Sequence, residues 1–173
     1  MNIFLVGPMG VGKTTIGRSL ARQLGLKFYD SDQEIERRAG ADISWIFDVE
    51  GEPGFRDRET QMIDELTQKD GVLIATGGGS VLRQENREML HERGVVIFLD
   101  TSLELLVKRT EKDKKRPLLQ NADREEVLTR IKRERQPLYE ETAHMQVFVG
   151  EGSSKKIVTG IVQTLHDEGY IEE

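Results

Sequence analysis

The chain has 173 residues, of which 36% are hydrophobic, so it is long enough for one domain with a buried core and unlike a disordered or fibrous chain. Its 25 Lys and Arg residues against 31 Asp and Glu residues give a formal net charge of −6, which argues against nonspecific binding to nucleic acid or a membrane surface. The lack of cysteine excludes disulfides and thiolate metal sites and is compatible with a reducing compartment.

The N-terminal stretch MNIFLV is apolar but has no basic lead, and it reaches Gly7 too soon for a signal peptide or a membrane span. We therefore expect a soluble cytoplasmic protein.

Short apolar runs that predict strands alternate along the chain with segments of helical period. The predicted strands are residues 3–6, 28–29, 72–75, 95–99 and 147–149. The predicted helices carry the apolar stripes Ile16/Leu20/Leu24, Met62/Ile63/Leu66, Leu103/Leu106/Val107 and Ile157/Val158/Ile161/Val162/Leu165. Continuously apolar strands joined by crossover helices are typical of a three-layer α/β domain with a parallel sheet, whose ligands gather at the carboxyl ends of the strands.

Two further segments have a local interpretation. Trp45, Ile46 and Phe47 follow Ser44, a residue that favours a helix start, and they predict the packed face of a short helix. The charged run EKDKKR, residues 111–116, is followed by Pro117 and by Asp123, which is a plausible cap for the next helix. This charged stretch is expected to be a mobile insertion.

The strongest motif is GPMGVGKT, residues 7–14, which matches the phosphate-binding pattern G-x-x-x-x-G-K-[ST] between a predicted strand and a predicted helix. Its glycines let backbone N–H groups point at phosphate oxygens, Lys13 reaches the β- and γ-phosphates, and the Thr14 hydroxyl meets Mg²⁺. A simple glycine turn would not need Lys13. The residues predicted to bind the nucleotide here are Gly10, Val11, Gly12, Lys13, Thr14 and Thr15.

The second predicted strand ends in FYDSD, which places Asp30 and Asp32 across the cleft from the phosphate-binding loop. One carboxylate can support the Mg²⁺ shell while the other accepts or orients a hydroxyl proton. The alternative for Asp32 is that it only caps the helix bearing Ile35, as aspartate often does.

Three glycines in ATGGGSV, residues 75–81, follow an apolar strand and indicate either a tight turn or a backbone that must approach something closely. Arg56, Arg116 and Arg135 are individually unremarkable, since most arginines are solvated or form weak surface pairs. Together they offer forked donors suited to a carboxylate and to phosphoryl oxygens.

These motifs, with KRPLL and RQPLYEETA, occur in the order and approximate spacing of the bacterial shikimate kinases, which the chain resembles over nearly its whole length. The resemblance implies one domain over residues 1–173 with the fold of the nucleoside monophosphate kinases and a five-stranded parallel sheet of order 2-3-1-4-5. It also implies a substrate-binding helical segment at about residues 32–60 and a lid at about residues 111–123.

The implied reaction transfers a phosphoryl group from ATP to the 3-hydroxyl of shikimate, giving 3-phosphoshikimate in aromatic amino-acid biosynthesis, with one Mg²⁺ ion and a monomeric enzyme. By resemblance, the shikimate-binding residues are Asp32, Arg56, Gly77, Gly78, Gly79 and Arg135. The implied catalytic residues are Lys13, Asp32 and Arg116, and the implied metal-binding residues are Thr14 and Asp30. Arg109 and Arg116 join the nucleotide-binding set, Arg109 beside the adenine, with the loop at residues 150–154 closing its other side.

Two alternatives share the phosphate-binding loop. A kinase of gluconate or of a nucleoside monophosphate has the same fold but does not need both FYDSD and TGGGS in this arrangement. A GTPase-type switch would explain DVEG at residues 48–51, but this element follows a helical segment and the sequence has no N-K-x-D motif.

Overall fold

The computed structural model describes residues 1–111 and 123–172, so Arg116 and almost all of the predicted lid lie outside the described residues. The strands are β1 (Ile3–Val6), β2 (Lys27–Asp30), β3 (Val72–Ala75), β4 (Val95–Asp100) and β5 (Met145–Phe148). The described helices are α1 (Lys13–Leu24), α2 (Ser31–Ala39), α3 (Ile43–Thr67), α4 (Gln84–Arg93), α5 (Leu103–Thr110), α6 (Arg124–Thr142) and α7 (Ser154–Asp167).

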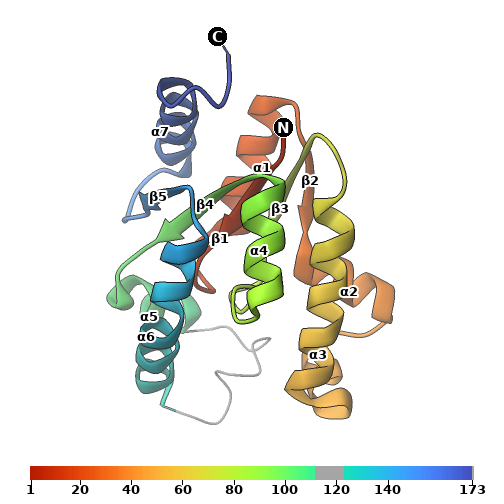
Figure 1. The fold of residues 1–173 in the computed structure, drawn as a ribbon. Coiled ribbons are helices and arrows are strands. Elements are labelled where there is room, and N and C mark those ends of the chain that lie inside the picture. Colours follow the sequence, from red (N-terminus) through yellow and green to blue (C-terminus); the bar gives the residue numbers. More distant parts are fainter. Residues whose placement is uncertain (112–122, 173) are drawn as a thin grey trace.

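The five strands form one parallel sheet of order β2-β3-β1-β4-β5, which confirms the predicted architecture. Helices cover both faces of the sheet, with α4 on one side and α1 on the other in Figure 1. Since the strands run in parallel, their carboxyl ends share one edge, and the loops that follow β1, β2 and β3 meet there.

The core has two halves because successive residues of a strand point to opposite faces. Ile3 and Leu5 of β1 pack with helices α1 and α7, whereas Phe4 and Val6 pack with residues of α2, α3, α4 and α6. All four β1 side chains are fully buried. A continuously apolar β1 is therefore what a central strand between two helical layers requires.

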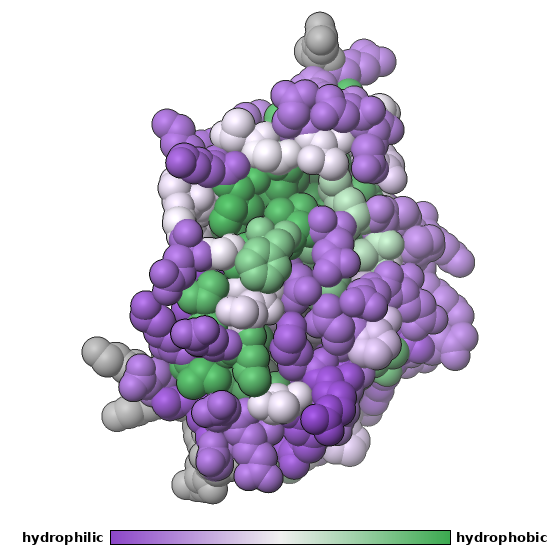
Figure 2. Space-filling model, turned by 90° about the vertical axis from the view of Figure 1, so that its left-hand side faces the viewer, coloured by the Kyte–Doolittle hydropathy of each residue, from purple (hydrophilic) through white to green (hydrophobic). Residues whose placement is uncertain are grey.

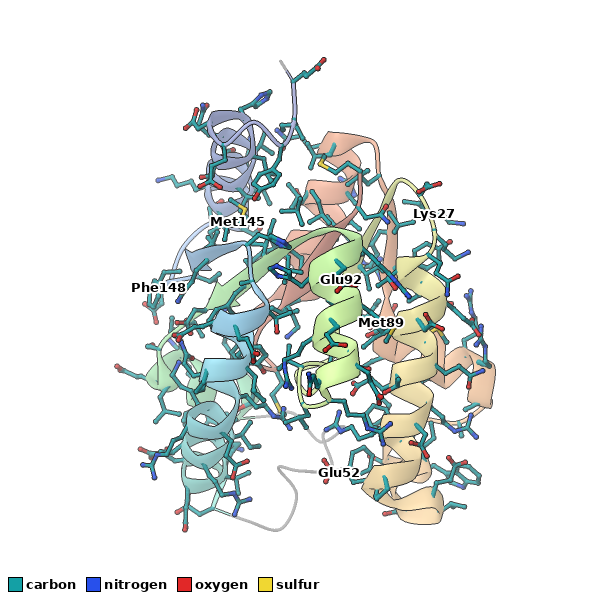
Figure 3. All side chains as sticks on the ribbon, in the orientation of Figure 1. Lys27, Glu52, Met89, Glu92, Met145 and Phe148 are labelled. Carbon is teal, nitrogen blue, oxygen red and sulfur yellow. The ribbon has the colours of Figure 1, made fainter. Side chains whose placement is uncertain are left out.

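The sequence predicted the central strands better than the edge. β5 begins at Met145, two residues before the predicted start. The apolar pattern did not indicate this start, because β5 pairs only with β4 and its burial alternates, with Gln146 exposed. Phe148 is 65% exposed and points away from the sheet in Figure 3. The space-filling view onto this side of the molecule shows apolar side chains among polar ones (Figure 2). An edge strand lacks the continuous apolar run used to predict strands.

The predicted short helix around Trp45 is present, but its packed face differs from the prediction. It begins at Ile43 with Asp42 as its N-cap, and Gly51, whose φ of 74° and ψ of 174° are not helical, separates it from the rest of α3, which ends at Thr67. Ile46 is fully buried, but Trp45 is 52% exposed and is not part of the packed face. The expected cap at Asp123 is confirmed, since its side chain accepts a hydrogen bond from the Glu126 N–H.

Helix α4 was not predicted because it lacks an apolar stripe, with only Asn86 and Leu90 fully buried. Across residues 1–111 and 123–172, no helix combines the length and apolar character needed to cross a bilayer.

Candidate active site

The phosphate-binding loop connects β1 to α1 at the carboxyl edge of the sheet. Gly7, Gly10 and Gly12 all have positive φ, and Gly12 is the left-handed N-cap of α1. No described side chain caps this helix, so the first-turn N–H groups and the positive end of the helix dipole are available to an anion. The loop has the backbone geometry that phosphate binding requires.

Lys13 is buried and lies back over the loop. Its Nζ donates to the carbonyl oxygens of Gly7 and Pro8, at 2.6 and 2.8 Å. These contacts hold a positive charge beside the N-terminus of α1, where phosphate oxygens would be bound.

Thr14, in the first turn of α1, contacts Asp30, the last residue of β2. The Thr14 hydroxyl donates to Asp30 Oδ2 at 2.8 Å, and Asp30 Oδ1 accepts from the Gln33 N–H at 3.1 Å. Asp30 is thus the N-cap of α2. A hydroxyl and a carboxylate at this position fit Mg²⁺, which takes oxygen ligands and uses few carboxylates when phosphates supply the rest. Within the described part of the chain, no cluster of three or more His, Cys, Asp or Glu side chains suggests a different metal site.

Asp32 lies in the first turn of α2 and is not its N-cap, because Asp30 has that role. Its Oδ1 is buried and has no hydrogen-bond partner among the described residues. Burial, followed by the negative charges of Glu59 and Asp30, raises the pKa of Asp32 to about 7, against the positive charges of Lys13 and Arg56. A carboxyl group with this pKa and an unused oxygen is suited to exchange a proton near neutral pH.

The triple glycine follows β3 and needs glycine for space. None of its three residues has a positive φ. A Cβ on Gly77 would lie 2.6 Å from Asp32 Oδ1, and one on Gly79 would lie 2.5 Å from Arg56 Nη2. A Cβ on Gly78 would lie 3.4 Å from Arg135 Nη1. The glycine backbone therefore packs directly against the three charged residues predicted to bind the acceptor.

Arg56 and Arg135 are both buried, at 8% and 4% exposure. Neither is therefore a solvated surface arginine, which was the alternative that the sequence left open. Arg56 Nη1 donates to Glu59 Oε1 at 2.9 Å, and Arg56 Nη2 donates to Glu52 Oε1 at 3.3 Å. Glu52 lies at the same end of the molecule as the α3 kink (Figure 3). Arg56 Nε has no partner among the described residues.

Glu59 is a buried carboxylate beside Arg56 that the sequence analysis did not single out. It is fully buried, and its Oε2 lacks a hydrogen-bond partner within the described residues. Burial raises the pKa of Glu59, while the charge and hydrogen bond of Arg56 and the charge of Arg135 oppose this. The available signal was its spacing of three residues from Arg56, which puts both side chains on one face of α3.

Arg109 lies on the other side of the phosphate-binding loop. Its Nη1 donates to the Val11 carbonyl at 3.0 Å and its Nη2 to the Gly150 carbonyl at 3.3 Å. Arg109 therefore links the phosphate-binding loop to the segment after β5, and it contacts Gly150 at the start of the loop predicted to lie on the other side of the adenine.

These parts surround a cavity of about 530 Å³. The predicted site residues in its wall are Gly10, Gly12, Lys13, Thr14, Thr15, Asp30, Asp32, Gly77 and Gly78. Arg56, Arg135 and Gly79 are just behind this wall, through the close approaches of the glycine loop. The nucleotide half of the predicted site, around the phosphate-binding loop, and the acceptor half, around Asp32 and the triple glycine, thus open into one cavity.

Comparison with known proteins gives a consistent result. The model of the shikimate kinase family matches residues 9–166. Shikimate kinase 1 of Sodalis glossinidius is 58% identical over 165 residues, which is 95% of each chain, and a shikimate kinase of Buchnera aphidicola is 56% identical over 96% of each chain. The solved shikimate kinase of Acinetobacter baumannii in complex with shikimate superposes with a TM-score of 0.95 at 48% identity, covering 96% of this chain and 93% of that one.

Proposed function

The chain belongs to the shikimate kinase family, and we propose that it transfers the γ-phosphoryl group of ATP to the 3-hydroxyl of shikimate through the residues around this cavity. The observation that carries the proposal is that Lys13 of the phosphate-binding loop and the half-buried Asp32 face one cavity. The transfer itself asks little beyond in-line positioning and charge stabilisation.

Asp32 orients the attacking hydroxyl and accepts its proton. Its Oδ1 has no partner among the described residues, so it is available to an acceptor hydroxyl. A pKa of about 7 balances the fraction of ionised carboxylate against its basicity at neutral pH.

Arg56 and Arg135 bind the shikimate carboxylate. Both guanidinium groups are buried beside the glycine loop, where a charge-assisted hydrogen bond is stronger than one made in water. Glu59 accepts a hydrogen bond from Arg56 Nη1 and so fixes the position of this guanidinium group.

At the nucleotide end, the loop residues Gly10 to Thr15 bind the phosphates, and Arg109 lies beside the adenine with residues 150–154 on its other side. Thr14 and Asp30 would hold one Mg²⁺ ion, which when bound neutralises charge on the β- and γ-phosphates. Lys13 stabilises charge on the transferred group. The enzyme is proposed to be a cytoplasmic monomer that binds neither nucleic acid nor membrane, consistent with its charge of −6.

Arg116 lies outside the described residues, and its role as a lid arginine that stabilises the transferred phosphoryl group stays a prediction. We expect Arg116→Ala to lower kcat about 100-fold, roughly 3 kcal/mol, with little change in the shikimate dissociation constant. Lys112→Ala and Lys114→Ala, in the same charged run, are the controls and should stay close to wild type. Equal and small effects of all three would assign EKDKKR to a solvated charge run.

The function itself is tested by ATP turnover against shikimate, gluconate and nucleoside monophosphates. ADP should form stoichiometrically with phosphorylated shikimate and hardly at all with the other acceptors. Phosphorylation of gluconate or a nucleoside monophosphate, with none of shikimate, would exclude the assigned acceptor while keeping the kinase fold.

A further inference from the structure

Tyr139 is a buried tyrosine on α6 whose hydroxyl contacts the triple glycine at residues 77–79. It is 1% exposed, and its ring packs against Phe98 of β4 with the ring centroids 5.0 Å apart. The hydroxyl donates to the carbonyl oxygen of Gly78 at 2.5 Å. This bond joins two segments 61 residues apart, so α6 holds the middle of the triple glycine directly.

The bond fixes more than one carbonyl, because a peptide unit is planar and normally trans. When the Gly78 carbonyl points at Tyr139, the N–H of Gly79 in the same peptide unit must point the opposite way. Glycines on both sides of a peptide bond would otherwise let the unit rotate at little steric cost. Tyr139 therefore selects one orientation of the Gly78–Gly79 peptide.

Within the part of the chain that the structure describes, the Gly79 N–H has no acceptor. Gly79 is buried, and neither it nor Gly78 donates its N–H to an acceptor within residues 1–111 and 123–172. A buried N–H without a partner is costly, and almost all such groups in folded proteins are paired. The neighbouring guanidinium of Arg56 is a donor and cannot satisfy it.

Tyr139 also shares its helix face with the proposed carboxylate ligand. Arg135 precedes it by four residues, one turn of α6, and both are buried beside Gly78. Burial raises the pKa of Tyr139 to about 12, against the opposing charge of Arg135, so the phenol stays protonated and remains a donor across the physiological range.

We propose that Tyr139 is a positioning residue for the acceptor: by holding the carbonyl of Gly78, which lines the cavity, it presents the Gly79 N–H of the same peptide unit to a ring hydroxyl of shikimate. The inference rests on the proposed acceptor but gives no chemical step to Tyr139. Its contribution belongs to acceptor recognition and not to phosphoryl transfer or nucleotide binding.

The test is Tyr139→Phe, which removes the hydroxyl and keeps the ring that packs on Phe98. We expect the KM for shikimate to rise about 10-fold, the effect of losing one well-placed hydrogen bond in a buried site. The kcat should change less than threefold and the KM for ATP should not change. Tyr170→Phe, at an exposed tyrosine, is the matched control and should leave all three constants unchanged.

Two further measurements separate positioning from a merely structural role. The KM of wild type and of Tyr139→Phe should also be compared for two shikimate analogues, one without the 4-hydroxyl and one without the 5-hydroxyl. For the analogue that lacks the hydroxyl bound by the Gly79 N–H, the two enzymes should have equal KM, because neither can make that contact. Replacing Tyr139 by 4-aminophenylalanine keeps a hydrogen-bond donor at the end of the ring, so the KM for shikimate should be within about threefold of wild type. This variant also tests the proposal if Tyr139→Phe does not fold.

An unchanged KM for shikimate in Tyr139→Phe, even with a lower melting temperature, would overturn the proposal. So would an equal penalty for shikimate and both deoxy analogues. A wild-type enzyme that does not phosphorylate shikimate would instead contradict the proposed function, so the two failures are distinguishable.

Discussion

The nucleotide half and the acceptor half of the cavity are built differently. The nucleotide half is built mainly on one contiguous loop. Its two cations, Lys13 at the end of this loop and Arg109 on α5, donate to the backbone carbonyls of Gly7 and Val11. The acceptor half combines side chains from α2, α3 and α6 around the glycine loop. Its charges are buried and incompletely paired: among the described residues, Asp32 Oδ1, Arg56 Nε and Glu59 Oε2 have no hydrogen-bond partner.

This difference indicates where stability is given up for function. A buried polar atom without a partner destabilises the fold unless a ligand satisfies it. The acceptor half keeps such atoms beside the position proposed for the acceptor, whereas the nucleotide half uses backbone groups that a helix N-terminus leaves available in any case. Substitutions in the two halves should therefore have different signatures.

The largest effect is expected from Asp32→Asn. The amide keeps the size of the side chain but cannot take the hydroxyl proton, so kcat should fall about 10³-fold. Affinity for ADP should stay near wild type, and the fold should persist because Asp30 caps α2. Steady-state kinetics and ADP titration measure the two quantities. Normal activity per folded molecule would remove Asp32 from the chemistry.

The same substitution should show the stability cost of the acceptor half. The folded-state pKa of Asp32, about 7, is above its ordinary value of 3.8, so the folded protein holds this proton more tightly than the unfolded chain. The stabilising contribution is complete below pH 4 and is lost as pH rises through 7. Between pH 5 and 8 wild type should therefore lose about 2–3 kcal/mol of unfolding free energy relative to Asp32→Asn.

Urea unfolding of both proteins at pH 5 and 8, without ligands, measures this difference. Glu59 titrates in both proteins, so its direct contribution largely cancels in the comparison. Unfolding free energies that change in parallel with pH would mean that Asp32 is not the strained carboxylate of the site.

The two halves also differ in how far the sequence predicts them. The phosphate-binding loop is contiguous, so its pattern and its place between a strand and a helix specify its geometry. Central strands such as β1 are recognisable because both faces are buried. The edge strand β5 and the polar helix α4 lack that signal and were shifted or missed.

In the acceptor half, the residues themselves pointed to Asp32, the triple glycine and the arginines one at a time. Only the resemblance to a family joined them into one acceptor site, since they lie far apart in the chain. Glu59 stands in the charged stretch FRDRET, where nothing in composition separates a buried carboxylate from a solvated one. Its burial depends on α3 packing beside the glycine loop. The role of Tyr139 could not be predicted for the same reason, because a hydrogen bond over 61 residues leaves no local pattern.

A smaller effect tests whether the acceptor half needs space more than flexibility. Gly79→Ala places a Cβ against the Arg56 guanidinium, which Glu59 holds in place, so Arg56 must shift. We expect the KM for shikimate to rise about 10-fold, the loss of roughly 1.4 kcal/mol of binding, with the KM for ATP unchanged.

Gly160→Ala is the control for this substitution. Gly160 lies in α7 with no atom within 4 Å of an added Cβ, so alanine should stabilise the protein by about 0.5–1 kcal/mol and leave the kinetics unchanged. An unchanged KM for shikimate in Gly79→Ala would show that the loop accommodates a side chain and that the triple glycine serves only the turn.

The smallest effect is expected at the nucleotide half, from Arg109→Ala. Two hydrogen bonds to backbone carbonyls would be lost, one to the phosphate-binding loop and one to Gly150, and each contributes only about 1 kcal/mol or less at a partly exposed position. The KM for ATP should rise about fivefold, while the KM for shikimate stays constant. Lys108→Ala is the matched control: it precedes Arg109 on α5 and reaches the same segment through Glu151, but that pair is exposed and should contribute little. If both variants raise the KM for ATP equally, the positive charge of α5 matters and not the link made by Arg109; if Arg109→Ala instead raises the KM for shikimate, the two halves are coupled through the phosphate-binding loop.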